Sequence, residues 1–217
     1  MDIKVDNRCY FIFDLDDTLY PEIEFLKSGY NSIVRYLEPI IKDNILDEML
    51  SRYFSKDNVF NWILSKYGDK GITKEKLLAI YRDHYPNIKL EKETYHFLNE
   101  LKVNNIPMGI ITDGRSRTQR NKLEALGIIN YFDDIIISEE FGSEKPNPKN
   151  FTFFEEKYPN HRFYFFGDNT SKDFIVPIKL NWVTFCLSDK GENIHEQDIN
   201  KFKGHVIRHF DDINLLF

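Results

Sequence analysis

Hydrophobic residues gather in short, nearly continuous runs, and the segments between these runs have helical spacing. The runs lie at residues 10–13, 108–112, 135–138, 163–166 and 183–186. Because they do not alternate between apolar and polar positions, they are typical of parallel strands that helices cover on both faces. Helical patterns follow at 91–103, 117–126, 150–158 and 171–180, and Gly127 is a C-cap signal for the second of them. This alternation predicts an α/β fold with a doubly wound, mainly parallel sheet.

The segment from residue 20 to residue 90 interrupts this alternation, because it contains helical patterns and no convincing strand. Gly68 and Gly71 mark a turn, and Thr73 is a candidate N-cap for the helix that follows. We therefore predict an all-α module at residues 20–90, inserted into a sheet domain formed by 1–19 and 91–217. Its apolar positions recur at helical spacing in three groups: Leu46, Met49, Leu50 and Tyr53; Val59, Trp62 and Ile63; and Leu77, Leu78 and Tyr81. An aromatic stripe is expected to belong to the core of this module: Tyr53, Phe54, Phe60 and Trp62.

Composition and charge narrow the classes of protein that this chain can represent. The 217 residues are 41% hydrophobic, which is ordinary for a globular protein. The net charge of −6 disfavours nucleic acid as a main partner, because binding to phosphate backbones requires a basic face. No apolar run is long enough to span a membrane. Cys9 and Cys186 lack metal-site or redox spacing and are expected to be free thiols, so we expect a cytoplasmic protein.

Polar side chains follow the predicted strands at the points where these strands end. In open α/β sheets, ligands bind beyond the carboxyl ends of the strands, so these groups are expected to converge. Such an excess of carboxylates over cations is tolerable when a hard cation neutralises it, and Mg²⁺ prefers oxygen ligands from a few carboxylates. The residues concerned are Asp14, Asp16, Asp17 and Thr18; Thr112, Asp113 and Gly114; Glu144 and Lys145; and Asp168, Asn169 and Asp173.

Four motifs along the chain resemble those of the haloacid dehalogenase (HAD) superfamily. They are FDLDDTLY, ITDG, EKPNP and GDNTSKD, and they occur in this order. The number of residues between the first and the second motif is similar to that in members of the phosphatase branch that carry a helical cap just after the first strand. The resemblance implies a Rossmann-like catalytic core at 1–19 and 91–217 and a helical cap domain at 20–90.

The resemblance also implies the catalytic and metal-binding roles. Asp14 would be the nucleophile that forms an aspartyl-phosphate. Asp16 would be the general acid and later the base, a role that suits a carboxyl group whose ionisation is opposed by neighbouring carboxylates. Mg²⁺ would be held by Asp14, by the backbone carbonyl of Asp16 and by Asp168, while Asn169 and Asp173 orient these ligands.

The substrate phosphate would be held at the second and third motifs. Thr112, with the backbone N–H groups of Asp113 and Gly114, would bind the phosphoryl oxygens. Lys145 would offset the charge of both the nucleophile and the phosphate. Asp113 stands where the family more often has Asn, so the role of its side chain is open. Arg115 and Arg117, which follow this turn, are further candidates for substrate contact.

The acid at position 16 favours phosphate-ester cleavage over dehalogenation, because a departing alkoxide needs a proton and a departing halide does not. The predicted function is Mg²⁺-dependent hydrolysis of a small phosphorylated metabolite: a sugar phosphate, phosphoglycolate or a nucleoside monophosphate. A phosphomutase of the same family is the alternative, followed by a phospho-aspartate signalling or binding module. The first motif resembles that of some nucleotidase members of the family. The spacing of the six histidines is not that of metal ligands. The candidates for substrate contact in the cap are Lys27, Lys56, Trp62 and Arg82.

Overall fold

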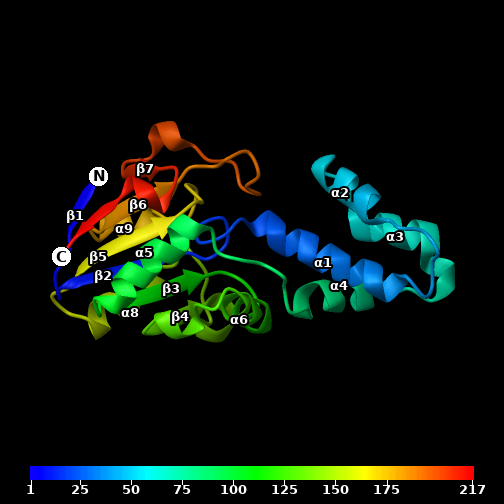
Figure 1. The fold of residues 1–217 in the computed structure, drawn as a ribbon, viewed down its shortest axis with the longest axis horizontal. Coiled ribbons are helices and arrows are strands. Elements are labelled where there is room, and N and C mark those ends of the chain that lie inside the picture. The colour runs from blue at the N-terminus through cyan, green and yellow to red at the C-terminus, as the bar shows by residue number, and fades with distance from the viewer.

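The computed structural model describes residues 1–217 and shows a sheet-containing lobe beside a purely helical one (Figure 1). The strands are β1 (Asp2–Lys4), β2 (Cys9–Phe13), β3 (Met108–Thr112), β4 (Asp134–Ile137), β5 (Arg162–Gly167), β6 (Val183–Leu187), β7 (His205–Ile207) and β8 (Asn214–Leu216). The helices are α1 (Glu22–Leu37), α2 (Leu46–Phe54), α3 (Val59–Tyr67), α4 (Lys74–Asp83), α5 (Lys92–Val103), α6 (Ser116–Ala125), α7 (Ser138–Phe141), α8 (Lys149–Lys157) and α9 (Ile175–Lys179), with short 3₁₀ turns η1 (Gly68–Lys70), η2 (Ile129–Tyr131), η3 (Ile199–Lys201) and η4 (Phe210–Asp212).

The main sheet is parallel and has the strand order β4-β3-β2-β5-β6-β7. Strand β2 lies at its centre, and the chain leaves β2 in one direction towards β3 and β4, then returns to its other side with β5. Strand order therefore reverses at β2, which is the arrangement of a doubly wound fold and leaves a crevice at the carboxyl end of that strand. The predicted fold class is confirmed.

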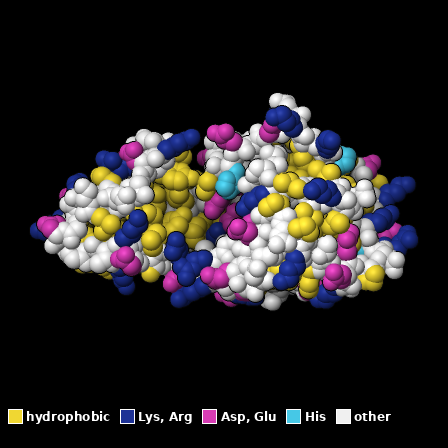
Figure 2. All heavy atoms as spheres, turned by 180° about the vertical axis from the view of Figure 1, so that it is seen from behind, with side chains coloured by type: hydrophobic (Ala, Val, Ile, Leu, Met, Phe, Trp, Pro, Cys, Tyr) yellow, Lys and Arg dark blue, Asp and Glu magenta, His cyan; other side chains and the backbone are white.

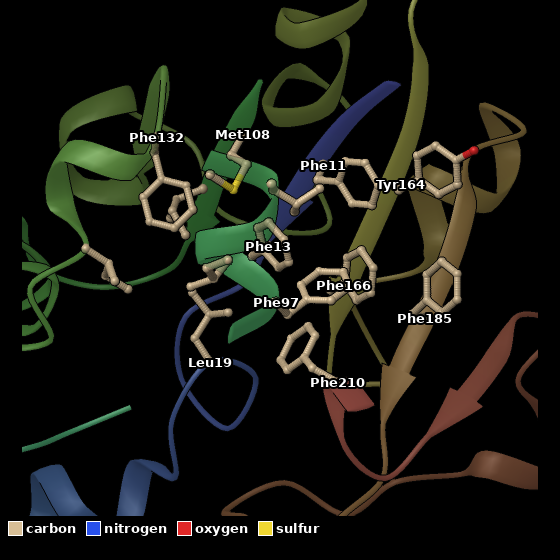
Figure 3. Close-up of a cluster of buried hydrophobic side chains, with 14 of the residues drawn as sticks. Phe11, Phe13, Leu19, Phe97, Met108, Phe132, Tyr164, Phe166, Phe185 and Phe210 are labelled. Atoms are coloured by element: carbon tan, nitrogen blue, oxygen red, sulfur yellow. The ribbon is translucent and has the colours of Figure 1, made fainter. Parts of the chain in front are cut away.

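Aromatic side chains fill the core on one face of this sheet (Figure 3). Phe166 of β5 stacks on Phe13 of β2, with ring centroids 5.0 Å apart, and on Phe185 of β6 at 4.6 Å. Phe97 of α5 and Phe210 of η4 pack edge-on or tilted against Phe166. These large rings bury more apolar area per residue than aliphatic side chains do, so neighbouring strands are fixed side by side. Rigid strands beneath the crevice allow the residues at their ends to be placed accurately.

The helical lobe has a separate core of 13 buried residues contributed by α1 to α4 and the turns between them. In α1, Ile23, Leu26, Tyr30 and Ile33 recur at the spacing of one helical face. Gly29 permits the close approach of α4, because a Cβ atom there would lie 2.5 Å from a ring carbon of Tyr81. The division into a core at 1–19 and 91–217 and a cap at 20–90 remains a prediction.

Most predicted elements are confirmed, and the exceptions have physical reasons. Helix α9 spans only Ile175–Lys179 instead of 171–180, because the preceding residues form a turn in which Asp173 N–H donates to Asn169 O at 2.9 Å. Ser138 begins α7 instead of ending a strand. Phe54 is exposed instead of belonging to the core of the helical lobe. Strands β1, β7 and β8 have three residues each, too short for a recognisable run.

Two further expectations can be compared with the structure. Cys9 and Cys186 are both free and buried, as predicted. None of the helices combines the length and the apolar character that a membrane crossing requires.

The stacked core generates a stability prediction. Replacing Phe166 with Ala removes a fully buried ring that contacts four other elements, and we expect the free energy of unfolding to fall by about 3–5 kcal/mol. Phe54→Ala is the matched control, because Phe54 is 63% exposed and its loss should change stability by less than about 0.5 kcal/mol. Urea denaturation followed by circular dichroism measures both, and equal losses would contradict the assignment of Phe166 to the core.

Candidate active site

A polar cavity of about 100 Å³ lies at the carboxyl ends of β2, β3 and β5, where the strand order reverses. Its position follows from backbone pairing: Asp14, the first residue after β2, donates its N–H to Phe166 O of β5 at 2.8 Å. No hydrophobic side chain lines the cavity. Seven of the predicted site residues line it, and four further residues complete it: Asp14, Asp16, Thr112, Asp113, Lys145, Asp168 and Asn169, joined by Asp17, Glu22, Lys172 and His195.

Lys145 lies at the centre of the acidic cluster. Its Nζ atom is 2.7 Å from Asp14 Oδ1 and 2.8 Å from Asp173 Oδ1, and its side chain is 1% exposed. Burial alone would favour the neutral amine, but the carboxylates of Asp14 and Asp173 raise the pKa of Lys145 above its ordinary value. The group is therefore a fixed ammonium ion that holds Asp14 in place.

Asp14, Asp168 and Asp173 bring carboxylate oxygens within 4.8 Å of one another. Asp173 is fully buried, and its Oδ2 accepts hydrogen bonds from the backbone N–H groups of Asp168 (3.2 Å) and Asn169 (2.9 Å). These bonds fix the turn that presents Asp168 to the cavity, which agrees with the orienting role expected of Asp173.

The charges of this cluster are not balanced by side chains alone. Burial, together with the carboxylates of Asp14, Asp173 and Asp17, raises the pKa of Asp168 to about 9. Burial and the charge of Asp173 likewise raise the pKa of Asp14 to about 7, even though Lys145 opposes the shift. A divalent cation between Asp14 and Asp168 would oppose both shifts by favouring the ionised carboxylates, so the donor set fits a hard, oxygen-binding metal ion such as Mg²⁺.

Asp16 differs from the expectation that neighbouring carboxylates oppose its ionisation. Although burial favours the protonated form, Lys122 and hydrogen bonds from Tyr20 and Gln119 hold the pKa of Asp16 below its ordinary value. Lys122 Nζ lies 2.7 Å and 2.9 Å from the two carboxylate oxygens, and Gln119 Nε2 donates to Oδ2 at 2.9 Å. That expectation was wrong because α6 brings a second buried ammonium group, that of Lys122, into contact with Asp16.

The end of β3 and the loop after it place Thr112 and Asp113 at the cavity but not Gly114. Asp113 Oδ2 forms an ion pair with Lys172 at 2.7 Å, and its Oδ1 accepts the backbone N–H of Lys145 at 3.0 Å. An Asn at this position would not carry the charge that pairs with Lys172, which gives the departure from the usual family residue a structural reason. The Gly114 N–H donates to Ser138 Oγ at 2.9 Å, so this arrangement does not support a phosphate contact through Gly114.

Residues 188–198 form a loop that closes one side of the cavity. The side-chain amide of Asn193 donates to Asp168 Oδ2 at 3.2 Å, and the N–H of Ile194 donates to Asp17 Oδ2 at 3.3 Å. His195, which follows directly, is exposed as expected and also lines the cavity. The loop is thus attached to the acids of the first and fourth motifs.

Several functional side chains were missed by the sequence reasoning. Gln119 and Lys122 are buried polar residues at i, i+3 spacing on α6, and Gln119 also donates to Thr112 Oγ1 at 2.6 Å. The only sign of their burial in the sequence is that both lie on the same face of the helix as the apolar Leu123. The other candidates for substrate contact do not line the cavity: Lys27, Lys56, Trp62, Arg82, Arg115 and Arg117.

Comparisons with known proteins agree with this geometry. The glyceraldehyde 3-phosphate phosphatase of Methanocaldococcus jannaschii is 29% identical over 216 residues, covering 93% of this chain and 95% of that protein. The pyrimidine 5′-nucleotidase YjjG of Escherichia coli is 38% identical over 87 residues, which is 39% of each chain. These relatives support a phosphoric monoester hydrolase.

The fold and the family are also shared with known proteins. The magnesium-bound HAD hydrolase YfnB of Bacillus subtilis superimposes with a TM-score of 0.64 at 18% identity, covering 95% of this chain and 97% of that one. The model of haloacid dehalogenase-like hydrolases matches residues 11–185, which include all four motifs and every predicted site residue. The chain therefore belongs to the haloacid dehalogenase-like hydrolase family.

Proposed function

We propose that this hydrolase removes the phosphoryl group from a small sugar phosphate, with Asp14 as the nucleophile and Mg²⁺ as the cofactor. The observation that carries the proposal is the position of Asp14: it lies at the switch point of the sheet, against the Lys145 ammonium and next to the Asp168 carboxylate. A relative that covers nearly the whole chain is named a glyceraldehyde 3-phosphate phosphatase, which supports a substrate of triose-phosphate size.

In the first step, an Asp14 carboxylate oxygen attacks phosphorus, and the bond from phosphorus to the leaving oxygen breaks. Lys145 holds Asp14 through Oδ1, so the side chain does not rotate away from the substrate. The ammonium groups of Lys145 and Lys172 lie at the cavity and offset the charge of the phosphoryl oxygens. Asp14 is thereby converted into an aspartyl-phosphate.

Asp16 transfers the proton in both steps. Lys122 keeps Asp16 ionised in the arrangement seen here. A bound phosphate adds negative charge beside Asp16 and so raises the pKa of this carboxyl group, which allows it to take up a proton and deliver it to the leaving oxygen. Asp16 then accepts a proton from the water that attacks phosphorus and releases Asp14.

A metal ion would be held by Asp14, by the backbone carbonyl of Asp16 and by Asp168. When bound, it would neutralise carboxylate charge and stabilise the negative charge of the phosphoryl group. Asp173 and Asn193 keep Asp168 oriented by hydrogen bonds to its backbone N–H and its carboxylate. The structural similarity to a magnesium-bound hydrolase is consistent with this assignment.

A nucleoside monophosphate substrate, a phosphomutase activity and a signalling role each receive less support than hydrolysis of a small sugar phosphate. The cavity of about 100 Å³ leaves room for a phosphoryl group and a short leaving group. The similarity to a nucleotidase covers only 39% of the chain, so a nucleoside monophosphate is the second candidate. The relatives described above are a phosphatase and a nucleotidase, and they give no support to a phosphomutase or a signalling module.

The proposed roles predict the effect of two substitutions. Asp14→Asn and Asp16→Asn should each reduce kcat for p-nitrophenyl phosphate and glyceraldehyde 3-phosphate by roughly 10²-fold or more, because they remove the nucleophile and the proton donor. Asp47→Asn, on the exposed side of α2, is the control and should retain the wild-type rate. Circular dichroism checks that each variant is folded. A folded Asp14→Asn variant with wild-type kcat would exclude Asp14 as the nucleophile.

The proposed metal site predicts a response to chelation. EDTA should abolish turnover, and added Mg²⁺ should restore it. Mg²⁺ should also raise the melting temperature of the metal-free protein, because it relieves the repulsion among Asp14, Asp168 and Asp173. Differential scanning calorimetry measures this shift, which Asp168→Asn should reduce strongly. Full turnover in the presence of EDTA would contradict the assignment of the cofactor.

The ion pair between Lys122 and Asp16 predicts a coupling between two substitutions. Lys122→Met leaves a buried carboxylate without its cation and should lower the free energy of unfolding by about 3 kcal/mol. Adding Asp16→Asn to Lys122→Met should recover part of that loss, since the unpaired charge is removed. Urea denaturation of the wild type, the two single variants and the double variant measures the coupling. Additive effects of the two substitutions would show that the pair is not formed in solution.

A further inference from the structure

The side chain of Glu22 lines the cavity, and its carboxyl group pairs with no other side chain. Glu22 is the first residue of α1, and its backbone N–H donates to Asp17 Oδ1 at 2.7 Å, which fixes the start of the helix beside the first motif. Its side chain is half-buried and lines the cavity. A half-buried carboxyl group without a partner is unfavourable unless something else satisfies it.

The nearby ammonium groups are each held by a different acid. Lys145 is held by Asp14 and Asp173, and Lys172 by Asp113. Lys122 binds both oxygens of Asp16, at 2.7 Å and 2.9 Å. No ion pair or hydrogen bond of the Glu22 carboxyl group is formed within the protein. It is therefore free to bind a ligand in the cavity.

The surroundings of Glu22 place it on the leaving-group side of the cavity. Glu22 and Asp16 line the same cavity, and Lys122, which binds Asp16, lies 4.3 Å from the ring centroid of Phe25, one turn after Glu22 on α1. The charge of Asp16 also contributes, after burial, to raising the pKa of Glu22 to about 8. In the proposed function Asp16 protonates the leaving oxygen, whereas Thr112 and Lys145 face the phosphoryl group. A group beside Asp16 therefore meets the part of the substrate that departs.

Aromatic side chains of the helical lobe lie near the same carboxyl group. Tyr81 packs against Phe25, one turn after Glu22 on α1, with ring centroids 5.5 Å apart. The charge of Glu22 also contributes, after burial, to raising the pKa of Tyr53 and of Tyr81. Both rings are half-buried. Figure 2 shows hydrophobic side chains gathered on the helical lobe where it borders the hollow between the lobes, with acidic side chains across that hollow. A carboxyl group beside aromatic faces suits a polyhydroxylated ligand, whose hydroxyls bond to the carboxyl group while its C–H groups pack on the rings.

We infer that Glu22 is a specificity-determining residue that binds a hydroxyl group of the leaving group, so that the enzyme selects hydroxylated phosphate esters over plain alkyl phosphates. This inference rests on the proposed function, because it takes the leaving group to depart beside Asp16. Both the carboxylic acid and the carboxylate accept a hydrogen bond from a hydroxyl, so the contact forms in either ionisation state. A site built to bond a hydroxyl discriminates strongly against an analogue that lacks it, since its own polar group is then left unpaired.

The test compares two substrates with the same three-carbon skeleton, glycerol 1-phosphate and n-propyl phosphate. The wild type should prefer glycerol 1-phosphate in kcat/KM by on the order of 10²-fold or more. Glu22→Ala should lower kcat/KM for glycerol 1-phosphate at least ten-fold more than for n-propyl phosphate. Glu22→Gln, which keeps a hydrogen-bonding amide, should retain most of the preference. Glu24→Ala is the matched control, because Glu24 lies on the same helix and pairs with Lys27 at 2.7 Å.

The outcomes separate the inference from the proposed function. An unchanged substrate ratio in Glu22→Ala, or equal losses for both substrates, would overturn the role of Glu22 while leaving the phosphatase intact. A wild type that hydrolyses neither these esters nor p-nitrophenyl phosphate in Mg²⁺ would overturn the proposed function, and the role of Glu22 with it. Should Glu22→Ala fail to fold, Glu22→Met takes its place, because it removes the hydrogen-bonding group and keeps most of the side-chain volume. A substrate ratio that stays at the wild-type value in this variant overturns the role of Glu22.

Discussion

The site depends on one buried ion pair network, in which the Lys145 ammonium is shared between Asp14 and Asp173. Removing an ammonium group and two carboxylates from water costs several kcal/mol per ion, and only close, well-oriented pairing offsets this cost. The pairing joins the end of β2, the turn after β5 and the segment that follows α7. A side chain that was free to move would not hold Asp14 in one orientation. The fixed orientation of Asp14 is thus a consequence of how its charge is compensated.

The same charge balance explains which groups remain available for ligands. Three buried or half-buried lysines are each bound to an acid, and three acids that line the cavity, Asp17, Asp168 and Glu22, are left without a cation. Burial and neighbouring carboxylates raise the pKa of all three, and only Asp17 accepts two backbone N–H groups. In the proposed function, Asp168 beside Asp14 would bind the metal ion, and Glu22 on the Asp16 side of the cavity would bind a hydroxyl group of the leaving group.

The sequence allowed the sheet and the residues at its carboxyl edge to be predicted, because continuous apolar runs mark buried strands and Asp14, Thr112 and Asp168 directly follow or end such runs. It gave no comparable signal for side chains that reach the site from a helix. Gln119 and Lys122 lie on α6, where polar residues normally face solvent, and only the tertiary fold shows that they are buried. The charge state of Asp16 was misjudged for the same reason, since its partner is distant in sequence.

Lys122 also connects the chemistry to the second lobe. Its Nζ atom pairs with Asp16 and lies 4.3 Å from the ring centroid of Phe25 on α1, so one ammonium group contacts both Asp16 and the helical lobe. A cation on an aromatic face is stabilised by the ring, and this stabilisation changes when the ring moves. The helix that carries Phe25 also carries Glu22. Any displacement of α1 when a leaving group binds would therefore act on the charge that sets the pKa of Asp16, which couples recognition of the leaving group to proton transfer.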